Sequence, residues 1–162
     1  MKYVHAVACA LSLLFPLTCL GAEDRFLAPP YGASASEIED ALKHCAGNQI
    51  QSNICKWSRF TEDESDMEAA TAALEALRKD KSPEEAEVLR RSQEAFIQFR
   101  NATCAFDSAG GGSLAFGLLY SCRSAYTQRR TAALRMYLDC VQGGGCAVPF
   151  LLYIYENENR GR

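Results

Sequence analysis

The feature that most constrains this chain of 162 residues is the distribution of its eight cysteines. Cys9 and Cys19 lie in an apolar N-terminal segment, and the other six lie between Cys45 and Cys146. An exported chain with an even number of cysteines usually pairs them as disulfides, whereas a cytosolic chain uses them as thiols or metal ligands. The compartment of the protein therefore decides what its cysteines do.

The N-terminal segment has the layout of a secretory signal peptide. Lys2 supplies a positive start, an apolar run extends from Val4 to Leu14, and the small residues Gly21-Ala22 precede an acidic stretch. Residues 1–22 are therefore predicted to be a signal peptide that is cleaved after Ala22. The remaining chain is then periplasmic or secreted.

Two other interpretations of this segment are less favoured. A retained membrane anchor needs about 20 apolar residues, and the uninterrupted run is shorter. A lipoprotein signal would make Cys19 the lipidated N-terminus, but Thr18 stands where a glycine or alanine is expected before such a cysteine.

Cleavage leaves six cysteines and changes the formal net charge from −3 to −4, because Lys2 is removed. No C-x-x-C motif is present in the sequence, which argues against thioredoxin-like redox chemistry and zinc knuckles. Six cysteines can pair in fifteen ways. Proximity along the chain favours the pairs Cys45–Cys55, Cys104–Cys122 and Cys140–Cys146.

The chain after the signal peptide is rich in helix signals. Residues 23–35 lack apolar periodicity and contain Pro29-Pro30, so they are predicted to be an extended leader. Ser36 and Glu39 have capping-box spacing and predict a short helix through Leu42 to about Cys45. A second helix is predicted from near Ile50 to about Lys79, where the acidic stretch 62–66 is either a solvated turn or a break.

A third helix is predicted from the Ser82-Pro83-Glu84-Glu85 capping signal to about Asp107. Its apolar stripe is expected to contain Leu89, Phe96, Phe99, Thr103 and Phe106. Gly110-Gly111-Gly112 ends it, and Ser113 is expected to cap a last helix to about Asp139. Residues 36–140 are thus predicted to be all-α, a small disulfide-stapled antiparallel helical bundle.

Residues 141–162 differ from the bundle, because they contain a glycine-rich break followed by an irregular apolar tail. The run Val148–Tyr155 is β-prone and too short to span a bilayer. It either packs back on the bundle under the Cys140–Cys146 bridge or is an exposed strand that binds a partner.

A Cys104–Cys122 bridge would also fix which residues of the last two helices face each other. In antiparallel helices joined at that point, Phe96 faces Arg130, and Arg100 faces Tyr126 and Thr127. Gln93 would face Ala133 or Leu134. Both arginines are therefore expected beside the helix–helix contact, where a guanidinium stacks on aromatic rings and donates hydrogen bonds to carbonyls or carboxylates.

These two helices carry motifs of a known family. The segment Gln93-x-x-Phe96-x-x-Phe99-Arg100-x-x-x-Cys104 resembles the Q-x-x-W-x-x-[YF]-R-x-x-x-C helix of the LprI-type lysozyme inhibitor N-terminal domain. Gly111-Gly112-Ser113 follows, and then Cys122-x-x-x-x-Thr127-x-x-Arg130-x-x-x-Leu134, which is similar to the C-x-x-x-x-T-x-x-R-x-x-x-L helix of that family. The resemblance covers roughly Cys45 to Leu138.

The resemblance implies a periplasmic or surface inhibitor of lysozyme. Phe96 replaces the usual tryptophan, and the D-x-x-L-N-x-x-Y element expected after the second cysteine is blurred into Asp66-Met67-Glu68-Ala69-Ala70. The motif residues are expected to be mostly structural, so they do not reveal where a ligand binds.

The composition excludes several other functions. No block of Lys and Arg marks a nucleic-acid surface. A glycosidase needs two carboxylates that flank a sugar cleft, whereas the carboxylates here lie in capping or solvated contexts. His44 is the only histidine outside the signal peptide and leaves little material for a catalytic triad. We therefore expect neither an enzyme, nor a metal, nor a cofactor.

The expected partner is a protein, either a lysozyme-like hydrolase or a secreted toxin. The acidic run supplies the candidate contact residues Glu62, Asp63, Glu64 and Asp66, although a plain solvated helix face explains the same pattern. Two alternatives remain open from the sequence. One is an immunity protein that neutralises a peptidoglycan hydrolase or lipase delivered into the periplasm, and the other is an envelope assembly factor.

Overall fold

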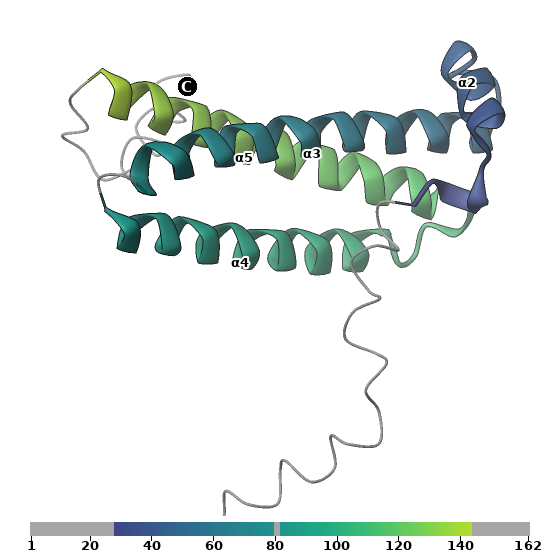
Figure 1. Cartoon of the computed structure of the whole chain (residues 1–162). Helices are drawn as coiled ribbons and strands as arrows, with labels where there is room; N and C mark the ends of the chain where they lie inside the picture. Colours follow the sequence, from purple (N-terminus) through teal and green to yellow (C-terminus); the bar gives the residue numbers. More distant parts are fainter. Residues whose placement is uncertain (1–27, 80–81, 144–162) are drawn as a thin grey trace, which may run out of the picture.

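The computed structural model describes residues 28–79 and 82–143. They form a short 3₁₀ turn, η2 (Pro30–Gly32), then α2 (Ala35–Lys43), α3 (Gln49–Lys79) and α4 (Pro83–Ser108), a second 3₁₀ turn, η3 (Gly112–Leu114), and α5 (Ala115–Gln142). The three long helices lie alongside one another, and α2 lies at one end of the bundle (Figure 1). The predicted all-α, disulfide-stapled antiparallel bundle is therefore confirmed.

The first helix begins two residues earlier than the sequence analysis expected. Ser34, not Ser36, is the N-cap, because its Oγ accepts the backbone N–H of Glu37 while the Glu37 carboxylate accepts the backbone N–H of Ser34 at 2.8 Å. This reciprocal capping box has the same S-x-x-E spacing as the predicted one. The Ser34 hydroxyl also donates to the Glu37 carboxylate at 2.6 Å, and this bond, followed by the one from the Ser34 backbone N–H, lowers the pKa of Glu37 from its ordinary value.

The acidic stretch in the second predicted helix does not interrupt it, since α3 is continuous over 31 residues. At the start of α4 the Ser82 cap is confirmed by the bond from the Glu85 N–H to the Ser82 hydroxyl. Glu85 was expected to complete the box, which is wrong. The Ser82 N–H donates instead to the Arg78 carbonyl at 2.7 Å, and the Glu85 carboxylate pairs with the Arg78 guanidinium at 2.8 Å.

Ser113 does not cap the last helix. It lies inside η3, which begins at Gly112 with a φ of 52°, a left-handed conformation that favours glycine. The helix α5 begins after Leu114 with no side-chain cap, and it continues to Gln142, beyond the expected end at Asp139.

The exposed stripe of α4 is the largest difference from the sequence analysis. Phe99 and Phe106, which were expected in the core, are 56% and 82% exposed. The buried line of α4 is instead formed by Ala86, Gln93, Arg100, Cys104 and Ser108. The helix is rotated in this way because an arginine and a glutamine, rather than two phenylalanines, find their partners inside the bundle.

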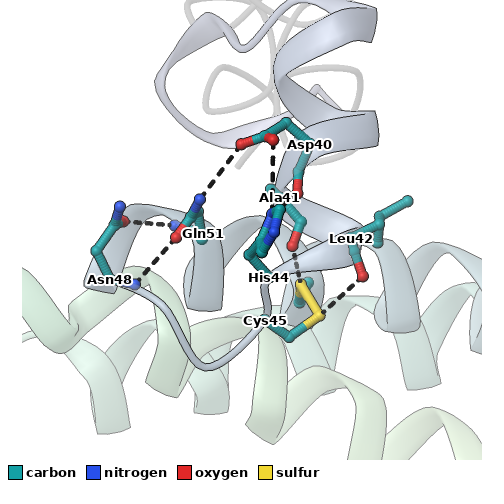
Figure 2. The surroundings of a disulfide bond; sticks show 8 residues. Asp40, Ala41, Leu42, His44, Cys45, Asn48 and Gln51 are labelled. Atoms are coloured by element: carbon teal, nitrogen blue, oxygen red, sulfur yellow. Dashed lines mark hydrogen bonds and ion pairs between the residues drawn. A yellow bond between two sulfur atoms is a disulfide. The ribbon is translucent and has the colours of Figure 1, made fainter.

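Both predicted disulfides that fall entirely on described residues are confirmed. Cys45–Cys55 ties α2 to the first turns of α3, and Cys104–Cys122 ties the end of α4 to α5 with a Cα–Cα distance of 5.6 Å. Around Cys45, Gln51 links the loop to α2, because its side chain bonds both Asn48 and Asp40 (Figure 2). Cys146 and the apolar run 148–155 lie outside the described residues, so the third bridge and the tail stay predictions.

The leader does not remain extended up to residue 35, because η2 interrupts it. Tyr31 adopts a left-handed backbone conformation with a φ of 62°. Its ring packs edge-on against Phe116, with ring centroids 5.0 Å apart, and its hydroxyl accepts a hydrogen bond of 2.6 Å from Asn53. These contacts fix the chain against the end of the bundle and offset the strain of a non-glycine residue at positive φ.

Candidate functional site

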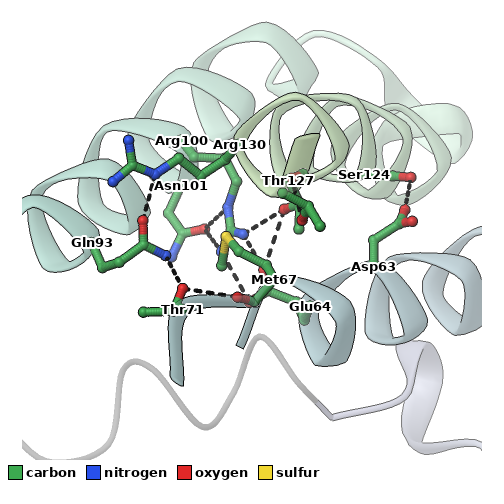
Figure 3. Close-up of polar contacts among 11 residues, drawn as sticks. Asp63, Glu64, Met67, Thr71, Gln93, Arg100, Asn101, Ser124, Thr127 and Arg130 are labelled. Carbon is green, nitrogen blue, oxygen red and sulfur yellow. Dashed lines mark hydrogen bonds and ion pairs between the residues drawn. The ribbon is translucent and has the colours of Figure 1, made fainter. Parts of the chain in front are cut away.

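The centre of the motif region is the buried side chain of Arg100, which is 2% exposed. Its guanidinium donates to the carboxylate of Glu64 on α3 and, at 2.6 Å, to the Thr127 hydroxyl on α5 (Figure 3). It also lies over the rings of Phe60 and Phe96, at 5.2 and 5.8 Å from their centroids. The expectation that Arg100 faces Thr127 across the α4–α5 contact is confirmed.

Arg130 forms a second centre one turn further along the same contact. Its Nε donates to the Gln93 side-chain oxygen, and its guanidinium lies 5.5 Å from the Phe96 centroid, as the predicted facing requires. Gln93 passes the connection on, because its amide donates to the Thr71 hydroxyl of α3 at 3.1 Å (Figure 3). Burial lowers the pKa of Arg130 from its ordinary value.

A third arginine, Arg123, lies in the same region of the core, and no motif in the sequence singled it out. It is fully buried, and its guanidinium lies 5.8 Å from the centroid of Phe60. Burial, and then repulsion from the Arg100 charge, lower its pKa. The signal was in the spacing, because Arg123, Thr127 and Arg130 fall on one face of α5 at intervals of four and three.

These contacts show what the motif residues do in the fold. The buried arginine network, formed by Arg100, Arg123, Arg130, Glu64, Gln93 and Thr127, joins all three long helices. Leu134 lies in the neighbouring apolar cluster, and Gly111, Gly112 and Ser113 lie in the α4–α5 connection. Phe99 is the exception, since its ring is exposed beside Tyr126. An interior network of this kind orders the bundle and leaves ligand binding to its surface.

The four candidate contact residues lie in different environments in the structure. Glu64 points inward and is bound by Arg100 and Thr127, so its carboxylate is not free to contact a partner. Asp63 is half-buried and accepts hydrogen bonds from Ser124 and Gln128 of α5. Glu62 and Asp66 are exposed, and Asp66 pairs with Arg135 at 3.1 Å.

A shallow groove runs between α3 and α5 beside these carboxylates. Its volume is about 170 Å³, and it is lined by Asp63, Asp66, Gln128, Thr131, Ala132 and Arg135. The groove is an open surface of mixed polar and apolar character, with two carboxylates on one wall and one arginine on the other. Such a surface suits contact with polar and basic side chains of a protein better than enclosure of a small molecule.

Two absences apply to residues 28–79 and 82–143. No three His, Cys, Asp or Glu side chains in these ranges are grouped so that they could hold a metal ion. None of the helices there combines the length and the apolar character that crossing a bilayer requires.

The comparison with protein families decides the membership of this chain. The family described as "Lysozyme inhibitor LprI" matches residues 43–134, more than half of the chain. The chain belongs to the LprI family. The matched LprI region contains the two disulfides that lie on described residues and the whole arginine network. A search of curated proteins and a search of solved structures each found no match.

Proposed function

We propose that this LprI-family protein is an exported periplasmic binding protein that inhibits a lysozyme-like peptidoglycan hydrolase by non-covalent occlusion. The family match carries this proposal, because it names inhibition of lysozyme and covers the folded core. The protein acts without catalysis of its own. Its rigid bundle supplies a surface that covers the substrate cleft of the hydrolase, and no covalent step is required.

The contact surface is the acidic face of α3 beside the groove, formed by Glu62, Asp63 and Asp66. The mature chain has a formal net charge of −4, so a cationic hydrolase is attracted to it. Complementary charge of this kind chiefly raises the association rate. Glu62 and Asp66 are the residues best placed for it, because both are exposed on the same helix.

The proposal is tested by lysis of bacterial cell walls, followed as loss of turbidity. Lysozymes of several types are incubated with and without the purified mature protein, and at least one is expected to be inhibited. The double variant Glu62→Lys/Asp66→Lys should slow association about tenfold at low ionic strength, and the difference should shrink in high salt.

The matched control is Glu84→Lys/Asp107→Lys, which makes the same change of net charge at two exposed positions outside the acidic run. It should retain most of the association rate. Equal losses in both variants would show that net charge, and not this face, attracts the partner. A complete lack of inhibition at high molar excess would contradict the inhibitor proposal, whereas tight capture of one delivered toxin would favour an immunity protein.

Export is part of the proposal and is tested separately. The protein recovered from the periplasmic fraction should begin at Glu23, which N-terminal sequencing or intact mass measures directly. Mass spectrometry of the same sample also tests the Cys140–Cys146 bridge, which lies partly outside the described residues. Recovery of a lipidated chain beginning at Cys19 would contradict the predicted cleavage.

A further inference from the structure

The two disulfides on described residues differ in how readily an external thiol can reach them. In the Cys45–Cys55 bridge, Cys45 is exposed in the loop between α2 and α3, and Cys55 is half-buried in α3. In the Cys104–Cys122 bridge, Cys104 is fully buried and Cys122 is half-buried. A thiolate must approach a disulfide sulfur directly to break the bond. Of these two bridges, only the first presents an exposed cysteine to such an attack.

The sulfur that leaves also differs between the two bridges. Attack on Cys45 expels the sulfur of Cys55, which is half-buried and takes up a proton close to the surface. Attack on Cys122 would instead expel Cys104 as a thiolate into the core, where burial disfavours the charged form. Both the entry of the reductant and the departure of the leaving group therefore favour the Cys45–Cys55 bridge.

The helix that this bridge holds has few other attachments to the bundle. Ala41 is the buried residue of α2, and the Lys43–Glu39 ion pair is internal to the helix. The hydrogen bond that Gln51 of α3 donates to Asp40 is long, at 3.3 Å (Figure 2). With nine residues, α2 is shorter than the about 12–15 residues below which an isolated helix is marginal in water. The helix therefore depends on the bridge.

The helices joined by the second bridge are also held together by other contacts. Arg100 of α4 donates to Thr127 of α5 at 2.6 Å. After reduction, the thiols of the Cys104–Cys122 pair stay close together, and this high effective concentration favours re-formation of the bond. The thiols of the Cys45–Cys55 pair separate when α2 leaves α3, so their effective concentration falls and the reduced form is favoured.

We propose that Cys45–Cys55 is a redox switch, which a dithiol reductant of the thioredoxin class opens to release α2 from α3. A thiolate of the reductant attacks the Cys45 sulfur and forms a mixed disulfide. The electron pair of the broken S–S bond goes to the Cys55 sulfur, which takes up a proton. The second thiol of the reductant then attacks the reductant's own sulfur in the mixed disulfide and releases Cys45 as a thiol. The protein gains two electrons and two protons, and the reductant becomes a disulfide.

The change is local, because the chain on both sides of α2 stays attached to the bundle. Before α2, Tyr31 packs against Phe116 and accepts a hydrogen bond from Asn53. After it, the chain enters α3. This inference does not rest on the proposed function, since the switch is measured on the free protein without any hydrolase.

Graded reduction of the folded, full mature chain tests the order in which the bridges open. Samples are incubated with dithiothreitol, the free thiols are alkylated at intervals, and peptide mapping by mass spectrometry reads each cysteine separately. Cys45 and Cys55 should become labelled at least tenfold faster than Cys104 and Cys122. Equal rates for the two pairs, or earlier labelling of Cys104 and Cys122, would overturn the proposal.

The attacked sulfur is identified with a thioredoxin whose second active-site cysteine is replaced by serine. This reductant stops at the mixed disulfide, which should form on Cys45. A mixed disulfide on Cys55, Cys104 or Cys122, or the lack of any complex, would contradict the proposed reaction.

Hydrogen exchange measures whether reduction releases α2. The backbone amides of residues 35–43 should exchange at least tenfold faster when the Cys45–Cys55 bridge is reduced and in the variant Cys45→Ser/Cys55→Ser, whereas those in the middle of α3 and α5 should be unchanged. The matched control Cys104→Ser/Cys122→Ser should leave exchange in α2 as in the wild type. An α2 that stays protected without its bridge, or that loses protection equally in the control, would refute the switch. Circular dichroism verifies that the bundle of both variants remains folded.

Discussion

The core of this bundle has two halves of opposite chemistry. Met67, Ala70, Leu74 and Leu134 form an apolar cluster in the second half of α3. The buried arginine network lies next to it, with Arg100 bound to Glu64 near the middle of α3 and Gln93 bound to Thr71 at the border of the apolar cluster. Met67 and Arg100 are both almost fully buried, at 1% and 2% exposure. The two halves thus exclude water equally well. They differ in how strictly their contacts fix the relative positions of the helices.

Apolar contacts have no preferred direction, so a cluster of methyl groups tolerates small shifts between helices. Charge-assisted hydrogen bonds lose energy steeply when their geometry changes. The Arg100 guanidinium reaches Glu64 on α3 and Thr127 on α5 at once. We infer that the arginine half sets the register of the three helices, while the apolar half contributes stability that does not depend on an exact register.

The largest expected effect comes from removing one member of the central ion pair. Arg100→Met should destabilise the fold by about 3–5 kcal/mol, because Glu64 is left largely buried without its cation. The double variant Arg100→Met/Glu64→Met should recover most of that loss, because the buried carboxylate is removed together with its cation, and Arg123 loses the repulsion of Arg100 along with the attraction of Glu64. Urea denaturation of the disulfide-intact chain measures all of these free energies of unfolding.

Leu74→Ala is the control from the apolar half. It should cost about 2–5 kcal/mol through the lost contacts and the cavity that remains. Its effect should add to that of Arg100→Met apart from a small coupling through Phe96, which packs against the apolar cluster and lies under the Arg100 guanidinium. A double variant Arg100→Met/Glu64→Met as unstable as the single one would contradict the view that the unpaired carboxylate is the source of the cost.

Removal of the Cys104–Cys122 bridge is the second prediction, with an expected loss of roughly 3 kcal/mol for a loop of this length. The bridge lies in the arginine half, close to Arg100 and Arg123 in sequence. If the network sets the register, Cys104→Ser/Cys122→Ser should keep the native contacts of Thr127 while losing stability. Nuclear Overhauser contacts between α4 and α5 measure the register independently of the stability, and a shifted register would show that the bridge sets it.

The facing of α4 and α5 could be predicted from the sequence because its cause is local. Two cysteines separated by 18 residues and a helical period of 3.6 suffice to place Phe96 against Arg130 and Arg100 against Thr127. The rotation of α4 could not be predicted in the same way. It depends on Glu64, which is 36 residues away from Arg100 and offers the buried carboxylate. A count of apolar residues places Phe99 and Phe106 inside, although the Cys104–Cys122 bridge already places Arg100 beside the contact, and the two signals cannot be weighed against each other without the position of Glu64.

The acidic run shows the same limit at the candidate site. The sequence identifies four carboxylates within five residues. The α-helical period tells which of them are buried and which are exposed only when the face of α3 that contacts Arg100 is known. The first helix start was missed for a different reason. Both Ser34 and Ser36 begin an S-x-x-E pattern, so the local signal does not distinguish them.

The smallest expected effect tests how finely the arginine half depends on each hydrogen bond. Gln93 is 7% exposed and links Arg130 to Thr71, so that α5 is connected to α3 through α4. Gln93→Leu keeps the side-chain volume and removes both bonds, which should cost about 1–3 kcal/mol, because the partly buried Nε–H of Arg130 loses its acceptor.

The double variant Gln93→Leu/Arg130→Met removes the donor as well as the acceptor, so it should be less destabilised than the sum of the two single variants. Urea denaturation of the four proteins in this cycle measures the coupling between the two side chains. Strict additivity would mean that Gln93 fills space in the same way as the residues of the apolar cluster. Arg100 alone would then set the register of the helices in the arginine half. The two halves would differ only in the single ion pair between Arg100 and Glu64.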